Sequence, residues 1–249
     1  TVTYTVTPVA NGCTGTSGTV VTEVYPWPVT SLTACYDTLT TTEADPFPLK
    51  GAVPYGGIFT GTGVTGTTFY PAIADTGYHE IRYVYTNDYG CSDTATITIH
   101  VVDAVSHTCG DPLTDLRDHQ VYPTVQIGSQ CWMAANFNHG SILPSTQVQR
   151  DNCLPEKHCL SDNPANCLTY GGMYTWNEIM RYTTTDGAQG LCPPGWHIPT
   201  EADWTILFNQ YVSNGFAGNA LKYSGYSGFN ALLEGVRFHQ LVWKFRSSD

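Results

Sequence analysis

Nine cysteines are spread along the 249 residues of the chain, and they restrict its possible folds more than any other feature. No two of them have the Cys-x-x-Cys spacing, and no His-Glu-x-x-His run occurs, so common zinc-site signatures are absent. Cysteines in this number predict disulfides and an oxidising compartment outside the cytosol. Because nine is an odd number, at least one cysteine stays free or pairs with another chain.

The charge of the chain excludes two classes of partner. Only 12% of the residues are charged, and the formal net charge is −11. Such a surface cannot displace counterions from nucleic acid, and it is repelled by anionic lipid. No apolar run approaches the 18 or more residues of a membrane-spanning helix. The sequence therefore predicts no nucleic-acid binding and no membrane insertion.

The composition changes near residue 104, which indicates at least two structural units. Residues 1–108 contain 25 threonines and only two basic residues, whereas the remainder contains five of the six tryptophans. We place a boundary around residues 103–106. The chain is divided into a partial hairpin with a linker (1–28), a β-sandwich (29–103) and a second domain (104–249).

Alternating apolar and polar residues predict strands in the first unit. Ile81, Tyr83 and Tyr85 fall on one face of a strand, and residues 94–101 alternate in the same way after the turn residues 87–90. Clusters of Pro and Gly separate further short strands. This pattern is typical of a β-sandwich, and no helix is expected before residue 104.

The first 25 residues repeat the layout of that hairpin. In both places a strand is followed by a turn ending in Gly-Cys, with Cys13 in the first copy and Cys91 in the second, and then by another strand. A lone hairpin cannot bury its apolar face. Either further strands precede it, or it completes a sheet in a neighbouring molecule by strand addition.

Two helices are expected in the second unit. Thr200 and Asp203 have the spacing of a capping box at a helix start. The residues that follow form one apolar stripe, made of Trp204, Leu207, Phe208 and Tyr211. A shorter helix is expected from about Met173 to Tyr182.

Three stretches of the first half resemble a known type of repeat. Residues 55–64 read YGGIFTGTGV, residues 77–83 read GYHEIRY and residues 90–93 read GCSD. They resemble the Ig/PKD-like repeats of bacterial type IX-secreted surface adhesins, over residues 29–103 and partly over 1–25. The resemblance implies a disulfide between Cys35 and Cys91.

Three stretches of the second half resemble another family. Residues 121–137 read VYPTVQIGSQCWMAANF, residues 170–178 read YGGMYTWNE and residues 192–204 read CPPGWHIPTEADW. They are similar to the Fibrobacter succinogenes major paralogous domain family, and the last run also resembles the C-type-lectin-like fold of sulfatase-modifying-factor domains. The resemblance implies a mostly β chain, with an Ig/PKD-like sandwich followed by an α+β C-type-lectin-like domain. It also pairs Cys159 with Cys167.

The connectivity of the other cysteines stays open: Cys13, Cys109, Cys131, Cys153 and Cys192. Two departures from the family pattern are expected to matter. Asp118-His119 stands where the family has Asp-Gly, so a different turn is expected there. Only residues 234–249 follow the segment 228–232, so the end of the fold is expected to be missing or replaced, which can leave one cysteine over.

Catalytic and cofactor motifs are weak. Residues 61–66 match Gly-x-Gly-x-x-Gly, but a strand and a proline follow instead of the helix that a dinucleotide site needs. No nucleophile elbow occurs, and the carboxylates are scattered. The prediction is therefore no enzyme, no metal site and no cofactor, with calcium binding left open.

Candidate surface residues fall into two groups. Thr38 and Thr94 follow aspartate and precede an apolar residue, as in bacterial O-glycosylation, although both can equally be ordinary strand threonines. Four aromatic residues are candidates for stacking on a ligand, unless they form the core: Trp176, Tyr223, Tyr226 and Trp243.

Together these features predict an extracellular structural or adhesive glycoprotein of a bacterial cell surface. It is expected to act as a stalk, fibre or filament subunit whose partners are neighbouring copies or adjoining adhesin domains. The alternative is a lectin-like module that binds a glycan or a protein within a larger adhesin.

Overall fold

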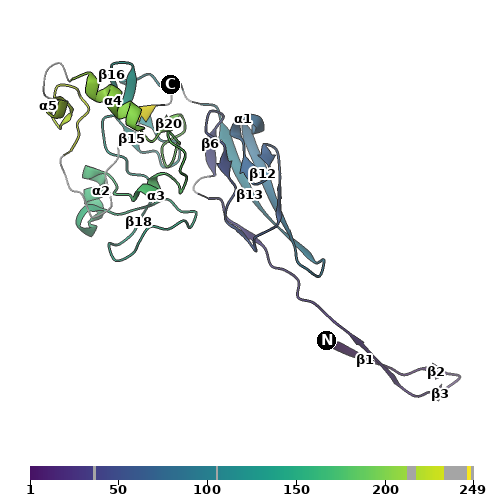
Figure 1. Cartoon of the computed structure of the whole chain (residues 1–249). Helices are drawn as coiled ribbons and strands as arrows, with labels where there is room; N and C mark the ends of the chain where they lie inside the picture. The colour runs from purple at the N-terminus through teal and green to yellow at the C-terminus, as the bar shows by residue number, and fades with distance from the viewer. Residues whose placement is uncertain (36–37, 105, 212–216, 233–245, 248–249) are drawn as a thin grey trace.

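The structure is a computed structural model that describes residues 1–35, 38–104, 106–211, 217–232 and 246–247. It is mostly β, as predicted, with short helices confined largely to the second half. Figure 1 shows a narrow ribbon at the N-terminus, a β-sandwich and a rounder second domain. None of the helices in these ranges has the length and apolar character needed to cross a bilayer.

The N-terminal ribbon is a long, two-stranded hairpin. Its strands are β1 (Val2–Val6) and β4 (Gly18–Thr22), which are antiparallel, and its far end is formed by β2 (Val9–Ala10) and β3 (Cys13–Thr14). Asn11 and Gly12 both have positive φ, at 50° and 80°, which is the geometry of a tight hairpin turn. The ribbon points away from the rest of the molecule in Figure 1.

The segment after the ribbon docks on the sandwich at the turn of residues 87–91. The rings of Tyr25 and Tyr89 stack with centroids 3.8 Å apart. The Asn87 side chain donates a hydrogen bond to the carbonyl of Pro26, and the Thr30 amide donates to Asp93 at 2.7 Å. The root of the ribbon is therefore held while the ribbon itself projects.

The sandwich contains one four-stranded sheet and two smaller ones. The large sheet has the order β6-β13-β12-β9, in which only the β6–β13 pair is parallel. Its strands are β6 (Leu39–Thr41), β9 (Ile58–Thr60), β12 (Gly77–Thr86) and β13 (Ser92–Val102). The smaller sheets are β10-β11-β7 and β5-β8, built from β5 (Ser31–Leu32), β7 (Phe47–Pro48), β8 (Ala52–Val53), β10 (Val64–Thr65) and β11 (Thr68–Phe69).

The core of the sandwich confirms the predicted alternation on β12 and β13. Ile81 is fully buried, and Ile99 and Val101 are each 1% exposed. They pack with Phe69 in one apolar cluster. The expectation of no helix before residue 104 is wrong, because α1 (Pro71–Ala74) forms a single turn after β11. One turn is too short to show helical periodicity in the sequence.

The second domain is irregular, with short strands and helices around two apolar clusters. Its main sheet has the order β16-β17-β21-β20, and β14–β15 and β18–β19 form separate pairs. The strands are β14 (Leu113–Thr114), β15 (Val121–Tyr122), β16 (Thr124–Ile127), β17 (Gln130–Met133), β18 (Ser141–Ile142), β19 (Glu156–Lys157), β20 (Trp196–His197) and β21 (Arg246–Ser247). The helices are the 3-10 helix η1 (Leu160–Asp162), α2 (Pro164–Tyr170), α3 (Trp176–Ile179), α4 (Glu201–Asn209) and α5 (Ala217–Leu221).

The capped helix is confirmed as α4. Thr200 is its N-cap and forms a reciprocal capping box with Asp203. The predicted apolar stripe is only partly correct, since Leu207 is fully buried but Phe208 is 44% exposed. The helix expected over residues 173–182 is shorter, because α3 ends at Ile179.

The disulfide expected between Cys35 and Cys91 is wrong. Cys35 is bonded to Cys153 of the second domain, and Cys91 is free. The topology explains the difference. Thr30 contacts Asp93 near the β12–β13 turn, but Leu39 already lies beside His100, so the chain runs parallel to β13 and carries Cys35 away from that turn.

The other two disulfides lie within the second domain. The predicted pair of Cys159 and Cys167 is confirmed, and Cys109 is bonded to Cys131. Cys13 and Cys192 are free, with Cys13 exposed and Cys192 buried.

The turn at Asp118-His119 contains a residue with positive φ. His119 adopts a φ of 59°, so histidine takes the left-handed conformation that glycine accepts more easily. The expectation for the chain end, over 234–249, falls mostly outside the described residues.

Candidate functional site

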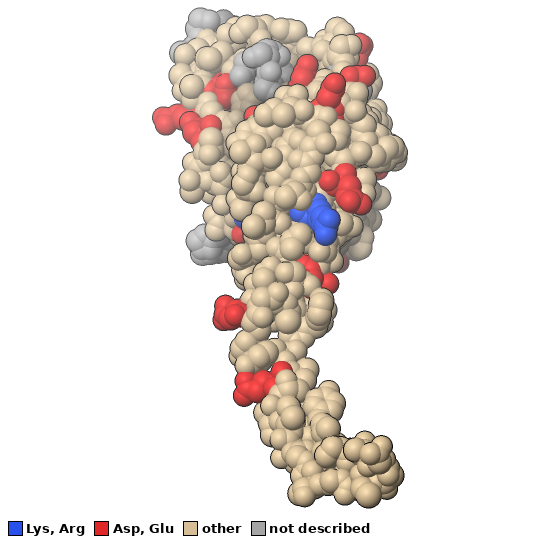
Figure 2. All heavy atoms as spheres, turned by 90° about the vertical axis from the view of Figure 1, so that its right-hand side faces the viewer, with Lys and Arg blue, Asp and Glu red and all other residues tan. Residues whose placement is uncertain are grey.

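The ribbon formed by β1 and β4 is the first candidate site, because no other described part of the chain covers its apolar residues. Every residue of β1 and β4 is exposed. On one face, Tyr4 lies opposite Val20, and each is 56% exposed; Val6 on the same face is 57% exposed. Residues 1–22 contain no charged side chain. In Figure 2 the narrow end of the molecule is correspondingly free of red and blue atoms.

Tyr4 and Tyr83 hold equivalent places in the two Gly-Cys hairpins but have opposite surroundings. Tyr83 is 1% exposed, its ring lies 4.8 Å from that of Phe59, and its hydroxyl donates to the Pro54 carbonyl. That hydroxyl also accepts a hydrogen bond from the Gly57 amide. Tyr4 has no such cover within the described chain. The ribbon therefore has the chemistry of a sandwich strand without the second sheet.

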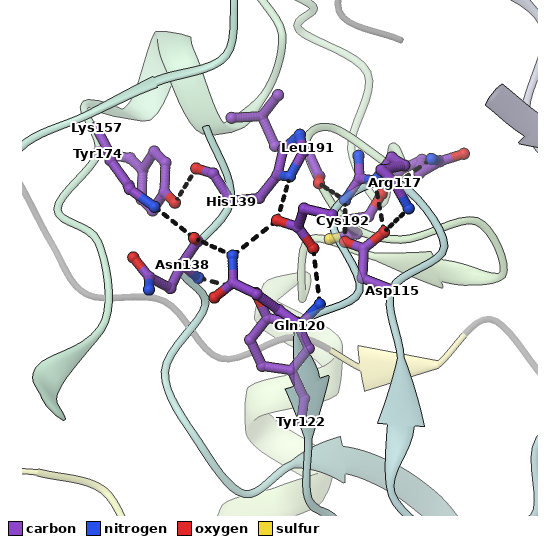
Figure 3. A network of polar contacts seen from close by, with 12 residues as sticks. Asp115, Arg117, Gln120, Tyr122, Asn138, His139, Lys157, Tyr174, Leu191 and Cys192 are labelled. Atoms are coloured by element: carbon purple, nitrogen blue, oxygen red, sulfur yellow. Dashed lines mark hydrogen bonds and ion pairs between the residues drawn. The ribbon is translucent and has the colours of Figure 1, made fainter. Parts of the chain in front are cut away.

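A buried polar network in the second domain is the next candidate, and Figure 3 shows it. Arg117 donates two hydrogen bonds to the two carboxylate oxygens of Asp115, at 2.9 and 2.7 Å, and a third to the carbonyl of Leu191. Asp115 is fully buried, and the side chain of Arg117 is 3% exposed. This pair ties the β14–β15 hairpin to the segment that contains Cys192.

Asp118 and His139 form the second part of the network. Nδ1 of His139 lies 2.7 Å from Asp118, and Gln120 donates to the same carboxylate from its amide and its side chain. Burial alone would raise the pKa of Asp118, but the hydrogen bonds from His139 and Gln120 outweigh burial and lower the pKa to about 2. Asp118 is therefore ionised at any physiological pH.

Asp115, Asp118 and His139 offer ligand atoms within 4.8 Å of one another, the spacing of a metal site. However, both oxygens of Asp115 already accept hydrogen bonds from the Arg117 guanidinium, whose positive charge opposes a cation nearby. The donor set therefore fits an internal ion-pair network better than a calcium site, which would need more oxygen ligands.

Two further groups in this region have shifted pKa values. Lys157 donates to the Asn138 carbonyl at 2.5 Å, and burial lowers the pKa of its amine to about 8. Burial raises the pKa of the Cys192 thiol well above its usual value. A buried thiol that resists ionisation is a poor nucleophile, so Cys192 has the character of a core residue.

A small pocket lies between α2 and the segments around β15 and β17. Its volume is about 280 Å³. Four carboxamide side chains line it, together with Tyr122, Tyr223 and small or apolar residues: Gln120, Asn136, Asn138 and Asn230. The sequence did not single out these amides, because they come from three separate segments and neutral amides form no recognisable motif.

The aromatic candidates are not gathered in one place. Tyr223 is 64% exposed and lines the small pocket, whereas Trp176 and Tyr226 are exposed but do not line it. Tyr226 instead meets Tyr211 edge to face. Trp243 lies outside the described residues.

The two candidate glycosylation threonines are both exposed. Thr38 directly precedes β6, and its neighbour Asp37 lies outside the described residues. Thr94 is on β13, where Arg82 donates to its hydroxyl at 3.4 Å. Both hydroxyls are on the surface, and the structure does not distinguish a modified threonine from an ordinary one.

Comparison with known proteins gives a match to a domain family. Residues 125–248 match the model of the Fibrobacter succinogenes major domain. No curated protein and no solved structure matches the chain, so the C-type-lectin-like and Ig/PKD-like assignments stay predictions. The second half of this chain is therefore a Fibrobacter succinogenes major domain.

Proposed function

We propose that this chain is a non-catalytic structural and adhesive subunit of a bacterial cell surface, which assembles with neighbouring copies through its N-terminal ribbon. The Fibrobacter succinogenes major domain supports a surface role, and three disulfides fit a protein that works outside the cytosol. The ribbon supplies the assembly surface.

The observation that carries the proposal is the unprotected ribbon. Strand edges on soluble proteins are usually protected by charged residues, prolines or bulges. Residues 1–22 contain one proline, Pro8, and no charge. Among the described residues β1 and β4 pair only with each other, so the outer edge of each strand is open. A strand from another copy would pair with this edge, and a second sheet of that copy would then pack on the face that carries Tyr4 and Val20.

A double substitution on the apolar face tests the proposal. Tyr4→Asp with Val20→Asp places two carboxylates on that face. Both positions are exposed, so each chain should still fold, but burying two charges against a neighbour is unfavourable. Light scattering and negative-stain microscopy should show oligomers or filaments for the native protein and monomers for the double variant.

The matched control is Thr5→Asp with Thr19→Asp. These residues face each other on the polar side of the ribbon, so this variant should assemble like the native protein. A native chain that stays monomeric up to about 1 mM, or a Tyr4/Val20 variant that assembles normally, would contradict the proposal.

A second candidate function is binding of a glycan by the second domain. The exposed aromatic residues Trp176 and Tyr223 favour it, because aromatic faces stack on sugar rings. A glycan array probed with monomeric protein tests this function, and an array with no bound glycan would exclude it.

Glycosylation of Thr38 and Thr94 stays part of the proposal as a surface modification. Both hydroxyls are exposed, as modification requires. The intact mass of native material decides the question, since a mass equal to that of the unmodified chain removes the idea.

A further inference from the structure

The small pocket of the second domain has an unusual chemical lining. Of the 14 described residues that line it, none is Asp, Glu, Lys, Arg or His, and four carry carboxamides. A carboxamide offers both a donor and an acceptor. The pocket therefore presents neutral hydrogen-bonding groups in both directions and no charge to bind an ion.

One of these amides is buried and unsatisfied. Asn138 is 7% exposed, and its Oδ1 has no hydrogen-bond donor among the described residues. Its backbone is fully engaged, since the amide donates to the Tyr122 hydroxyl and the carbonyl accepts from Gln120 and Lys157. In Figure 3 the carboxamide of Asn138 points away from His139 and Asp115. A buried acceptor without a donor costs stability. The oxygen is itself closed off from solvent, so a donor from outside the chain reaches it only when the side chains around it shift.

The entrance to the pocket is apolar and aromatic. Tyr223 is 64% exposed and Leu168 is 83% exposed, and both line the same cavity. An exposed aromatic face beside polar amides is suited to a ligand with one apolar face and a polar rim.

We propose that this pocket binds a single neutral sugar ring, with a ring hydroxyl donating to Oδ1 of Asn138 and the ring lying against Tyr223. The volume of about 280 Å³ is near the lower limit of ligand pockets, roughly 300 Å³, so it holds one ring and not a chain. No cation is among the described residues that line the pocket, which disfavours carboxylated or phosphorylated sugars.

This inference deepens the glycan-binding candidate and is independent of the ribbon, since no residue of 1–22 lines the pocket. The proposal of assembly and the proposal of sugar binding can therefore be refuted independently of each other. The double variant Tyr4→Asp, Val20→Asp should bind the sugar as the native chain does.

The test is titration of the full chain with methyl glycosides of glucose, galactose, mannose and N-acetylglucosamine, followed by ligand-observed NMR or calorimetry. At least one should bind with a Kd near or below about 10 mM, and glucuronate should bind more weakly. Asn138→Ala removes the unsatisfied oxygen while leaving the backbone contacts. It should weaken binding at least about tenfold without lowering the Tm.

Tyr223→Ala should weaken binding about fivefold or more. Tyr226→Ala is the matched control, because Tyr226 is 68% exposed but does not line the pocket, and it should change nothing. The proposal is overturned if no glycoside binds below about 10 mM, if Asn138→Ala binds as tightly as the native chain, or if Tyr226→Ala weakens binding as much as Tyr223→Ala does.

Discussion

Glu178 shows how a single residue links the fold of the second domain to pH. Its side chain is fully buried, with one oxygen accepting from the Glu156 amide at 2.8 Å and the other accepting from the Tyr182 hydroxyl at 3.1 Å. Burial raises the pKa of this carboxyl to about 7. The folded protein therefore holds a proton there that the unfolded chain has lost.

This proton makes stability fall as the pH rises. Between the unfolded pKa of 4.5 and the folded pKa of about 7, the folded state binds more protons than the unfolded state. The contribution of Glu178 is thus fully present below 4.5 and is lost as the pH rises through 7. Glu178→Gln should remove this dependence, so the Tm of the variant should decline less than that of the native protein between about pH 5 and about pH 7.5.

Glu201→Gln is the control, because Glu201 is exposed in the first turn of α4. It should leave the pH profile of the native protein unchanged. Identical profiles for native protein and Glu178→Gln would show that this carboxyl is already ionised in the folded state.

At the scale of the element, α4 depends on the box formed by Thr200 and Asp203. The Asp203 amide donates to the Thr200 hydroxyl at 3.2 Å, and the Thr200 amide donates to the Asp203 carboxylate at 2.9 Å. His197 lies 3.1 Å from the same carboxylate, which joins β20 to the helix start. The cap therefore supports a contact between elements as well as the helix.

Thr200→Ala should destabilise the second domain by about 1 kcal/mol, the usual value of an N-cap. Urea unfolding followed by tryptophan fluorescence measures this, since five of the six tryptophans are in the second half. The matched control is Thr205→Ala, an exposed threonine inside α4 that should cost far less. Equal losses for the two variants would mean that the cap contributes nothing.

Elements with strong local signals could be predicted from the sequence, and others could not. The β12–β13 hairpin and the start of α4 carry alternation and capping chemistry that need no tertiary information. In contrast, α2 has a capping Asn163 and a proline at its start, but Cys167 is its only buried residue, so no apolar stripe indicates a helix. Phe208 belongs to the apolar stripe of α4 but stays exposed. Helical periodicity predicts which residues share a face of the helix, but it does not predict which part of that face another element covers.

Of the two candidate sites, only the ribbon could be predicted from the sequence. The echo between the two Gly-Cys hairpins indicated the ribbon, because it is a local pattern. The pocket around Asn138 could not be predicted, since it depends on how α2 packs against distant segments.

At the scale of the whole molecule, a covalent link joins the sandwich to the second domain. Cys35 and Cys153 are 118 residues apart in the sequence and are bonded in the structure. Lys50 and Asp151 form an ion pair at 2.9 Å beside this link. No local pattern could predict the pair, because it depends on how two separate units pack.

Cleavage between the two units tests this link. With a protease site inserted between Asp103 and Ala104, the two fragments should stay together on a denaturing gel without reductant and separate after reduction. In Cys153→Ser they should separate in both conditions. If the two fragments of the cleaved native chain separated without reductant, the result would instead support a disulfide between Cys35 and Cys91.

Assembly of the whole molecule depends on the strand edges of the ribbon. Since a lone hairpin is marginally stable, its amides should exchange quickly in the dilute monomer. Hydrogen–deuterium exchange followed by mass spectrometry, from dilute to assembling concentrations, measures these amides directly. Exchange over residues 2–22 should slow as the concentration rises, while the sandwich core around Ile81 and Ile99 stays equally protected throughout. Exchange over residues 2–22 that is equally fast in assembled and dilute protein would contradict the account.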